Sequence, residues 1–162
     1  MSVRIRRAET ADLPEILPIY EKARAYMAQT GNPRQWGTAN PPAALLEADI
    51  DRGVLYLHIS EALVPCGAFA LIPGEDPTYG RIDGAWLSDE PYCTIHRIAS
   101  DGSRRGIFAD TLAFSRRICR HLRIDTHEDN RIMRALVTKH GFRYCGVIYL
   151  ANGDPRLAYE LL

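Results

Sequence analysis

The sequence predicts one α/β domain over residues 1–162, with a mixed, mostly antiparallel twisted sheet of six to seven strands flanked by about four helices. Two observations predict this class. Apolar residues recur at helical spacing in several stretches, and short runs with strand-like patterns lie between those stretches. The segment order is β-α-α-β-β-β-β-α-β-α-β-β, and no linker, repeat or low-complexity segment divides it.

The first third of the chain predicts one strand and two helices. Residues 3–7 alternate in polarity and open a strand. Residues 12–15 form a capping-box arrangement with proline in the first turn, so a helix is expected to follow. A loop over 30–37 separates it from a second helix over about 40–50, which Gly53 ends.

The rest of the chain alternates short strands with two further helices. Residues 54–60 and 64–72 are typical of a hairpin. The other expected strands are 81–86, 93–99, 121–126, 144–150 and 156–161, and the other expected helices run from about 106 to 120 and from about 130 to 140.

Composition excludes several classes of function. Twenty basic and twenty acidic residues cancel, so no overall charge favours nucleic acid or an anionic membrane. No apolar run approaches the roughly 20 residues that span a bilayer, and the N-terminus lacks a signal-peptide pattern. The four cysteines form no C-x-x-C pair and are expected to be reduced. These features predict a cytoplasmic protein with neither nucleic acid nor membrane as partner.

The segment 125–142 is the most informative stretch. Asp129 or Asn130 can cap a helix whose apolar stripe includes Met133. Gly141 stands where a helix turns left-handed to stop, and Phe142 can fold back on the last turn.

A second motif, residues 103–108, lies between a strand and a helix. A helix N-terminus offers free N–H groups and a positive dipole end, which suit a pyrophosphate. Gly106 would let the backbone approach phosphates, and Arg104 or Arg105 would add charge.

Together these motifs resemble those of the GNAT superfamily of acetyl-CoA-dependent N-acetyltransferases. The first GNAT motif is Q/R-x-x-G-x-G/A; here Gly106 fits, whereas Ser103 and Phe108 depart from it. The resemblance implies that the strand before the loop separates from the next strand, with the pantetheine arm pairing in the gap. The implied acetyl-CoA contacts are Ile98, Ala99, Ser100, Ser103, Arg104, Arg105, Gly106, Ile107, Phe108, Asn130 and Met133.

Acetyl transfer to an amine needs a base, and His96 is the candidate because its ordinary pKa suits neutral pH. A structural histidine is the other interpretation. Many family members carry a tyrosine four residues before the Gly-Phe pair as proton donor to the thiolate; here Val137 stands there. Tyr92 or Tyr144 could replace it, or water could, or the thiolate could leave unassisted.

The acceptor pocket is expected from the first two helices and nearby loops, with Trp36, Tyr26, Asp83 and Trp86 as candidates. The sequence D-x-H-E-D beginning at Asp125 matches no known ligand spacing, so no metal is expected. Asp125 or His127 could instead orient His96 or the acceptor.

The resemblance thus implies acetyl transfer from acetyl-CoA to the primary amine of a small molecule by direct attack in a ternary complex. It also implies a homodimer. Two alternatives stay open: a non-catalytic acyl-CoA-binding or sensor domain, favoured by Ser103, Phe108 and Val137, and an acetyltransferase that acts on a protein amine.

Overall fold

A computed structural model describes residues 4–162, in which eight strands form one sheet in the order β1-β2-β3-β5-β6-β8-β7-β4. The strands are β1 (Arg4–Arg7), β2 (Leu55–Ile59), β3 (Pro65–Pro73), β4 (Asp83–Gly84), β5 (Cys93–Ser100), β6 (Leu122–Thr126), β7 (Arg143–Tyr149) and β8 (Pro155–Leu161). The helices are α1 (Leu13–Gln29), α2 (Ala43–Asp51), α3 (Ile107–Ile118) and α4 (Arg131–Lys139). Neighbouring strands are antiparallel except β5 and β6, which are parallel.

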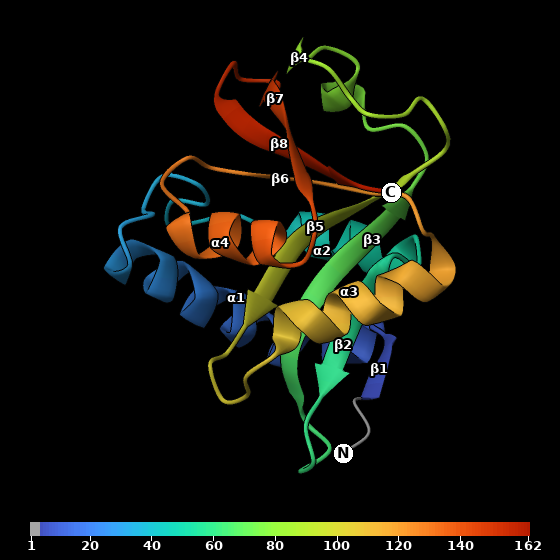
Figure 1. The fold of residues 1–162 in the computed structure, drawn as a ribbon. Helices are drawn as coiled ribbons and strands as arrows, with labels where there is room; N and C mark the ends of the chain where they lie inside the picture. Colours follow the sequence, from blue (N-terminus) through green and yellow to red (C-terminus); the bar gives the residue numbers. More distant parts are fainter. Residues whose placement is uncertain (1–3) are drawn as a thin grey trace.

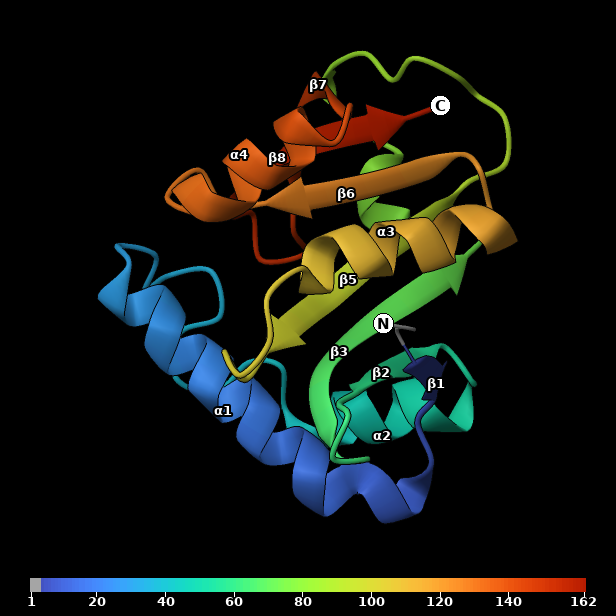
Figure 2. The ribbon, with the colours of Figure 1, turned by 60° about the horizontal axis from the view of Figure 1, so that its bottom comes forward.

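The helices cover the two faces of the sheet in pairs. Figures 1 and 2 show α3 and α4 on one face, and α1 and α2 on the other. The predicted α/β class, the mostly antiparallel sheet and the four helices are confirmed, and the sheet has eight strands, slightly more than the six to seven expected in it, because all eight strand-like segments join it. None of the helices in residues 4–162 has the length and apolar character needed to cross a membrane.

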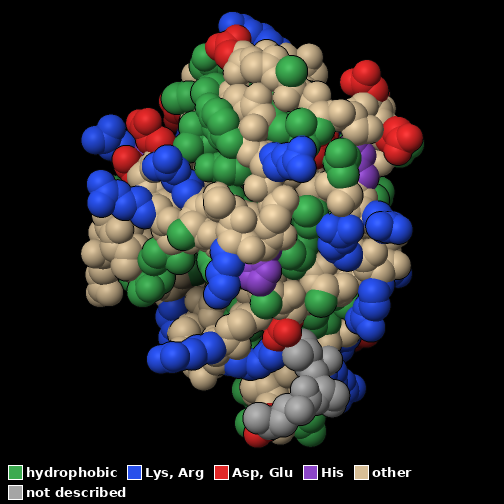
Figure 3. Space-filling view, viewed as in Figure 1, with side chains coloured by type: hydrophobic (Ala, Val, Ile, Leu, Met, Phe, Trp, Pro, Cys, Tyr) green, Lys and Arg blue, Asp and Glu red, His purple; other side chains and the backbone are tan. Residues whose placement is uncertain are grey.

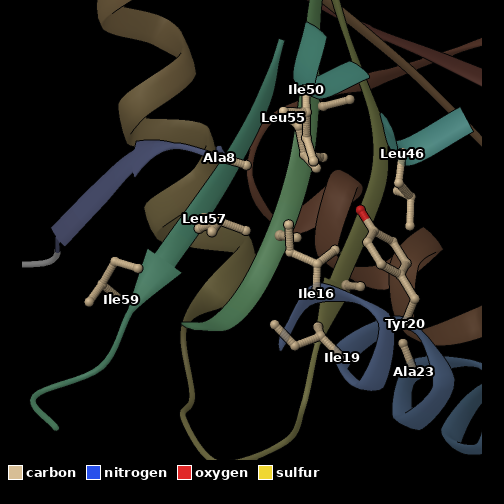
Figure 4. Packing of buried hydrophobic residues seen from close by; sticks show 13 residues of the cluster. Ala8, Ile16, Ile19, Tyr20, Ala23, Leu46, Ile50, Leu55, Leu57 and Ile59 are labelled. Carbon is tan, nitrogen blue, oxygen red and sulfur yellow. The ribbon is translucent and has the colours of Figure 1, made fainter. Parts of the chain in front are cut away.

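One core lies between the sheet and the α1–α2 pair. Ile16 and Tyr20 of α1 are completely buried, as are Leu46 of α2 and Leu57 of β2. Figure 4 shows these side chains converging on one space, because the helical stripe of α1 faces the inward positions of β2 and β3. This packing fixes α1 and α2 beside β5, where the candidate site lies.

Three local expectations need correction. The capping box lies one turn earlier than expected, because the Asp12 carboxylate accepts from the backbone N–H of Glu9 and pairs with Arg6. The helix expected from residue 40 begins at Ala43, after two prolines. The strand expected over 81–86 is reduced to β4, since Trp86 packs on Tyr79 and does not continue the ladder. Val3, where the first strand was expected to begin, lies outside the described residues.

The edge strand β4 pairs with β7 so closely that the two facing residues, Gly84 and Gly146, must both be glycine. A Cβ on Gly84 would lie 2.1 Å from the carbonyl oxygen of Cys145, and a Cβ on Gly146 would lie 2.2 Å from that of Asp83. The pairing of β4 with β7 holds the 81–92 loop at the edge of the sheet.

A buried ionic cluster also holds the 81–92 loop against the sheet. Glu160 is completely buried and accepts from His121 Nε2 at 2.7 Å, Arg123 Nε at 2.6 Å and the Leu87 N–H at 2.6 Å. The Arg123 guanidinium lies 3.9 Å from the ring centre of Trp86. Such a cluster is stabilising only while every charge in it has its partner.

Candidate active site

The central strands separate and leave a cavity between them. In the described chain, β5 and β6 pair at Cys93–Leu122 and Thr94–Arg123, and the strands then diverge. The divergence opens a cavity of about 360 Å³ lined by β5, β6, the start of α4 and the 35–41 loop. The separation that the resemblance implied is therefore present.

A bulge in β5 shapes one wall of this cavity. The register with β3 shifts between Ala68 and Ala70, and Arg97 has φ +52°. A non-glycine residue in this region costs about 1–2 kcal/mol, so other contacts must hold it. Tyr20 Oη donates to the Arg97 carbonyl at 2.6 Å, and the Arg97 guanidinium binds both carboxylate oxygens of the buried Asp49. A regular strand would direct Arg97 away from the His96 face; the bulge directs both side chains towards the α1–α2 side.

His96 lies in the cavity wall and has a carboxylate partner. Its Nε2 lies 2.7 Å from Asp76 Oδ2. The contact with His96 and two bonds from Thr78 to Oδ1 lower the pKa of Asp76 to about 2, against the opposing effect of burial. Asp76 is thus ionised at neutral pH and only accepts, so Nε2 of His96 carries the proton. Nδ1 is then the ring nitrogen that can receive a proton from a substrate.

A second carboxylate, Asp125 of β6, lines the same cavity. Tyr79 Oη donates to Asp125 Oδ2 at 2.6 Å. Burial, together with the carboxylate of Asp125, raises the pKa of Tyr79 well above its ordinary value, so Tyr79 stays a donor. Tyr79 also lies 6.2 Å from the His96 ring, between centres, so the Tyr79–Asp125 pair is a neighbour of the His96–Asp76 pair.

The N-terminus of α4 faces the cavity through Asn130. Its Oδ1 accepts from the Met133 N–H at 3.0 Å, which identifies Asn130 rather than Asp129 as the cap. Its Nδ2 donates to Gln35 Oε1 at 2.9 Å. Gln35 Oε1 also accepts from Thr126 Oγ1 and Asn32 Nδ2, so one amide oxygen ties the 30–41 loop to β6 and α4.

The loop before α3 contains a glycine in the left-handed region at the start of the helix. Gly106 caps α3 in the left-handed region at φ +83°, and a Cβ there would meet no atom nearer than 3.9 Å. Arg104 pairs with Asp110 in the first helical turn, while Arg105 is exposed. Figure 3 shows that basic side chains predominate over acidic ones on the face that carries α3 and α4, although the whole chain is neutral.

Several predicted cofactor residues meet at the cavity. Ile98, Asn130 and Met133 line it directly. Ala99 and Ser100 continue β5 towards the loop, where Ser100 Oγ accepts from the Gly102 N–H and Ser103 bonds to Asp101. Arg104, Arg105 and Gly106 form the turn into α3. Ile107 and Phe108 are buried in its first turn, so their backbone N–H groups, not their side chains, are available there.

The predicted acceptor residues do not all gather at this cavity. Trp36 lines it and packs on Tyr20 at 5.7 Å between ring centres. Tyr26 is 56% exposed on the outer side of α1. Asp83 accepts from Tyr149 Oη on the edge strand, and Trp86 donates to the Tyr79 carbonyl behind the cavity.

The tyrosines considered as proton donors lie outside the cavity lining. Tyr92 Oη accepts from the Asp76 N–H at 2.8 Å, so it supports the loop that carries Asp76. Tyr144 is 56% exposed and packs on Tyr159 at the other end of the sheet. Val137 is completely buried between α4 and the sheet.

The segment around His127 is arranged locally. His127 Nδ1 accepts from the Asp129 N–H, and the contact to His96 that we considered for His127 or Asp125 is made by Asp76 instead. Within residues 4–162, no group of three or more His, Cys, Asp or Glu side chains is placed to hold a metal ion. All four cysteine thiols are free.

Sequence reasoning missed Asp76, Gln35 and Arg156 as cavity residues. The Asp-Pro-Thr sequence from Asp76 predicts a local turn, which the structure contains, yet it carries no sign of a partner 20 residues later. Arg156 appeared to be only the start of a strand. That it has no carboxylate within ion-pair distance among the described residues depends on the folded structure.

Comparison with solved structures places this geometry in a family. No protein-family model and no curated protein matches the chain. An acetyltransferase of the GNAT family from Streptococcus agalactiae has 31% sequence identity and a TM-score of 0.89, covering 99% of this chain and 95% of the other.

Two further structures share the fold at lower identity. A GNAT-family acetyltransferase from Listeria monocytogenes has 20% identity and a TM-score of 0.71, over 98% of this chain and 95% of its own. A GNAT phosphinothricin acetyltransferase from Sinorhizobium meliloti, solved in complex with AcCoA, has 13% identity and a TM-score of 0.64, over 99% of this chain and 88% of its own. The first of the three similarities extends to sequence along nearly the full length, and the chain therefore belongs to the GNAT family of acetyltransferases.

Proposed function

We propose that the protein transfers the acetyl group of acetyl-CoA to a primary amine of a small molecule, by direct attack within a ternary complex. The observation that carries the proposal is the cavity between β5 and β6, which has a histidine–carboxylate pair in its wall. Acetyl-CoA supplies the activated acetyl group, and the chain supplies binding, orientation and proton transfer.

The binding groups for acetyl-CoA lie along one path. The β6-facing edge of β5 beyond Thr94 has backbone groups free of a strand partner and suits the amides of a pantetheine arm. The turn at Gly106 and the free N–H groups of the first turn of α3 suit a diphosphate. Asn130 and Met133 border the same path from α4.

His96 is proposed as the base. The Asp76 carboxylate fixes its Nε2–H, so Nδ1 takes a proton from the amine nucleophile. N–H groups of the separated β5 edge are proposed to donate to the thioester carbonyl as it gains negative charge. Asp76 is a positioning residue, because it acts through His96.

The acceptor is proposed to be small because side chains border the cavity on two opposite sides. Trp36 and Met27 border it on the α1 side, and Asp76 and Thr78 border it on the loop side. A protein amine would need an open groove along the surface.

The decisive experiment has two stages. Calorimetric titration with acetyl-CoA and with free CoA should give micromolar binding that Asn130→Ala and Gly106→Glu weaken. A panel of primary amines should then reveal acetyl transfer that His96→Ala reduces by at least about 100-fold, as expected for loss of a general base. His127→Ala is the matched control, since it removes an imidazole that does not line the cavity.

The outcomes separate the alternatives. Tight binding with no transfer to any amine, peptides included, would leave an acyl-CoA-binding or sensor domain. Transfer to peptides alone would make the acceptor a protein. Absence of binding to both ligands would reject the enzyme.

A further inference from the structure

Arg156 is a buried cation in the cavity wall that lacks an acidic partner. It is 6% exposed, and it donates to the carbonyl oxygens of Pro155 at 2.9 Å and Gln35 at 3.3 Å. Among residues 4–162, no carboxylate oxygen lies within 4.0 Å of its guanidinium. By contrast, Arg97 is paired with Asp49, and the buried Arg123 is paired with Glu160.

A buried charge without a partner is costly, so the lack of a carboxylate near Arg156 in the described chain calls for a functional explanation. Taking a guanidinium out of water costs several kcal/mol unless an anion compensates it. Burial lowers the pKa of Arg156, and the more distant Asp125 and Asp154 only partly oppose that effect. The planar fork of an arginine side chain binds a carboxylate through two parallel hydrogen bonds. The Arg156 guanidinium is therefore suited to bind an anionic group of a ligand.

The sheet register places Arg156 on the same face as Asp125. Asp125 of β6 pairs with Ala158 of β8, and Arg156 stands two residues before Ala158, so all three side chains share one face. Asp125 and Arg156 are diagonal neighbours with Cα atoms roughly 7–8 Å apart. Both side chains line the cavity, which thus presents a carboxylate and a guanidinium as neighbours.

His96 belongs to this face as well. Thr94 is in register with Arg123, so His96 two residues later faces the same side as Asp125. We propose that the acceptor is an amino acid whose carboxylate binds Arg156 while its ammonium group lies by Asp125 and His96. This inference rests on the proposed acetyl transfer and specifies its substrate class.

The chemistry balances without another reactant. The acceptor nitrogen forms a bond to the acetyl carbon, and the carbon–sulfur bond of the thioester breaks. The ammonium group gives up two protons; one passes through His96 to solvent, and the other converts the departing thiolate into the thiol. The acceptor carboxylate stays ionised throughout, so its contact with Arg156 holds the amine in place.

The test compares matched acceptors. Each common amino acid is assayed beside its methyl ester and the amine that lacks the carboxyl group. For the best substrate, kcat/KM should exceed that of both derivatives by about 100-fold, which is in the range expected when one partner of a buried charge pair is removed. This comparison needs only the wild-type protein. Equal kcat/KM for the amino acid, its ester and the amine, or a preference for the amine, would overturn the inference.

Variants then assign the effect to Arg156. Arg156→Met should remove the preference for the carboxylate, and Arg156→Lys should retain part of it. Both should bind acetyl-CoA as the wild type does, which shows that they are folded. Arg120→Met, at an exposed arginine outside the cavity, is the matched control. A carboxylate preference that survives in Arg156→Met would refute the assignment, whereas failure of every acceptor would refute acetyl transfer itself.

Discussion

Replacing Asp76 by Asn tests whether a charged carboxylate holds His96 in its working orientation. The structure gives the size of the effect on stability. The pKa of Asp76 falls from 3.8 to about 2 in the folded protein. That lowering corresponds to roughly 2.5 kcal/mol that favours the ionised carboxylate in the folded protein, at about 1.4 kcal/mol for each tenfold change in proton affinity. Asp76→Asn should therefore destabilise the protein at pH 7 by up to about 2.5 kcal/mol.

The sign of the pH dependence follows from the lowered pKa. Since the folded pKa lies below the unfolded one, the contribution is complete above the unfolded value of about 4 and is lost as pH falls towards 2. At pH 3, about 1 kcal/mol of it should already be lost. The gap in unfolding free energy between wild type and Asp76→Asn should consequently narrow by that amount.

Urea denaturation at pH 7, 5, 4 and 3 measures this gap. Glu75→Gln, at an exposed acid in the same loop, is the matched control and should track the wild type. In the acetyl-transfer assay, kcat for Asp76→Asn should fall by about 10- to 100-fold, the range found when a group that orients a metal-bound imidazole is replaced. Acetyl-CoA affinity should not change. A gap that stays constant from pH 7 to pH 3 would refute the electrostatic argument, and an unchanged kcat would refute the positioning role.

Three other substitutions test the supports around the site. Glu160→Gln should lower the free energy of unfolding by about 3–5 kcal/mol in urea denaturation, because it leaves the buried Arg123 without its anion; a loss below 1 kcal/mol would contradict the ionic role. Asp49→Asn should cost a similar amount and also reduce acetyl transfer, since Asp49 holds the bulge at Arg97; unchanged activity would show that the bulge stands without it. Gly106→Ala should cost about 1 kcal/mol in thermal unfolding from backbone strain alone, because its Cβ meets open space; a stabilised protein would refute the left-handed cap.

Elements could be predicted from sequence where a local signal decides the conformation. The helix α4 carries its cap, its apolar stripe and its glycine stop within one short segment, and Asn130 and Gly141 act as expected. Residues 81–86 have strand-like composition, but Trp86 packs over Arg123 and Tyr79, so the ladder stops after two residues. That outcome depends on partners from other elements, which composition does not reveal.

The candidate site was predictable in part for the same reason. His96 could be named because its strand precedes the loop that resembles a phosphate-binding motif. Asp76 approaches His96 only because the 74–80 loop folds back across β5, and Gln35 reaches Asn130 across 95 residues of chain. The lack of an ion-pair partner for Arg156 within residues 4–162 could not be predicted, since it depends on which side chains the fold brings within reach.

The divergence of β5 from β6 has a mechanical consequence for the whole molecule. In the described chain, backbone pairing joins one half of the sheet, β1-β2-β3-β5, to the other, β6-β8-β7-β4, at two residue pairs. A ligand bonded to both borders of the gap would tie the halves together and raise the unfolding free energy by about 2.7 kcal/mol at a hundred times its Kd. Amide exchange in β6 and β8 should then slow together with exchange in β5. The two halves of the sheet would be coupled while the ligand is bound and would move more independently after its release. The flexibility of the sheet would therefore fall and rise once in each catalytic cycle.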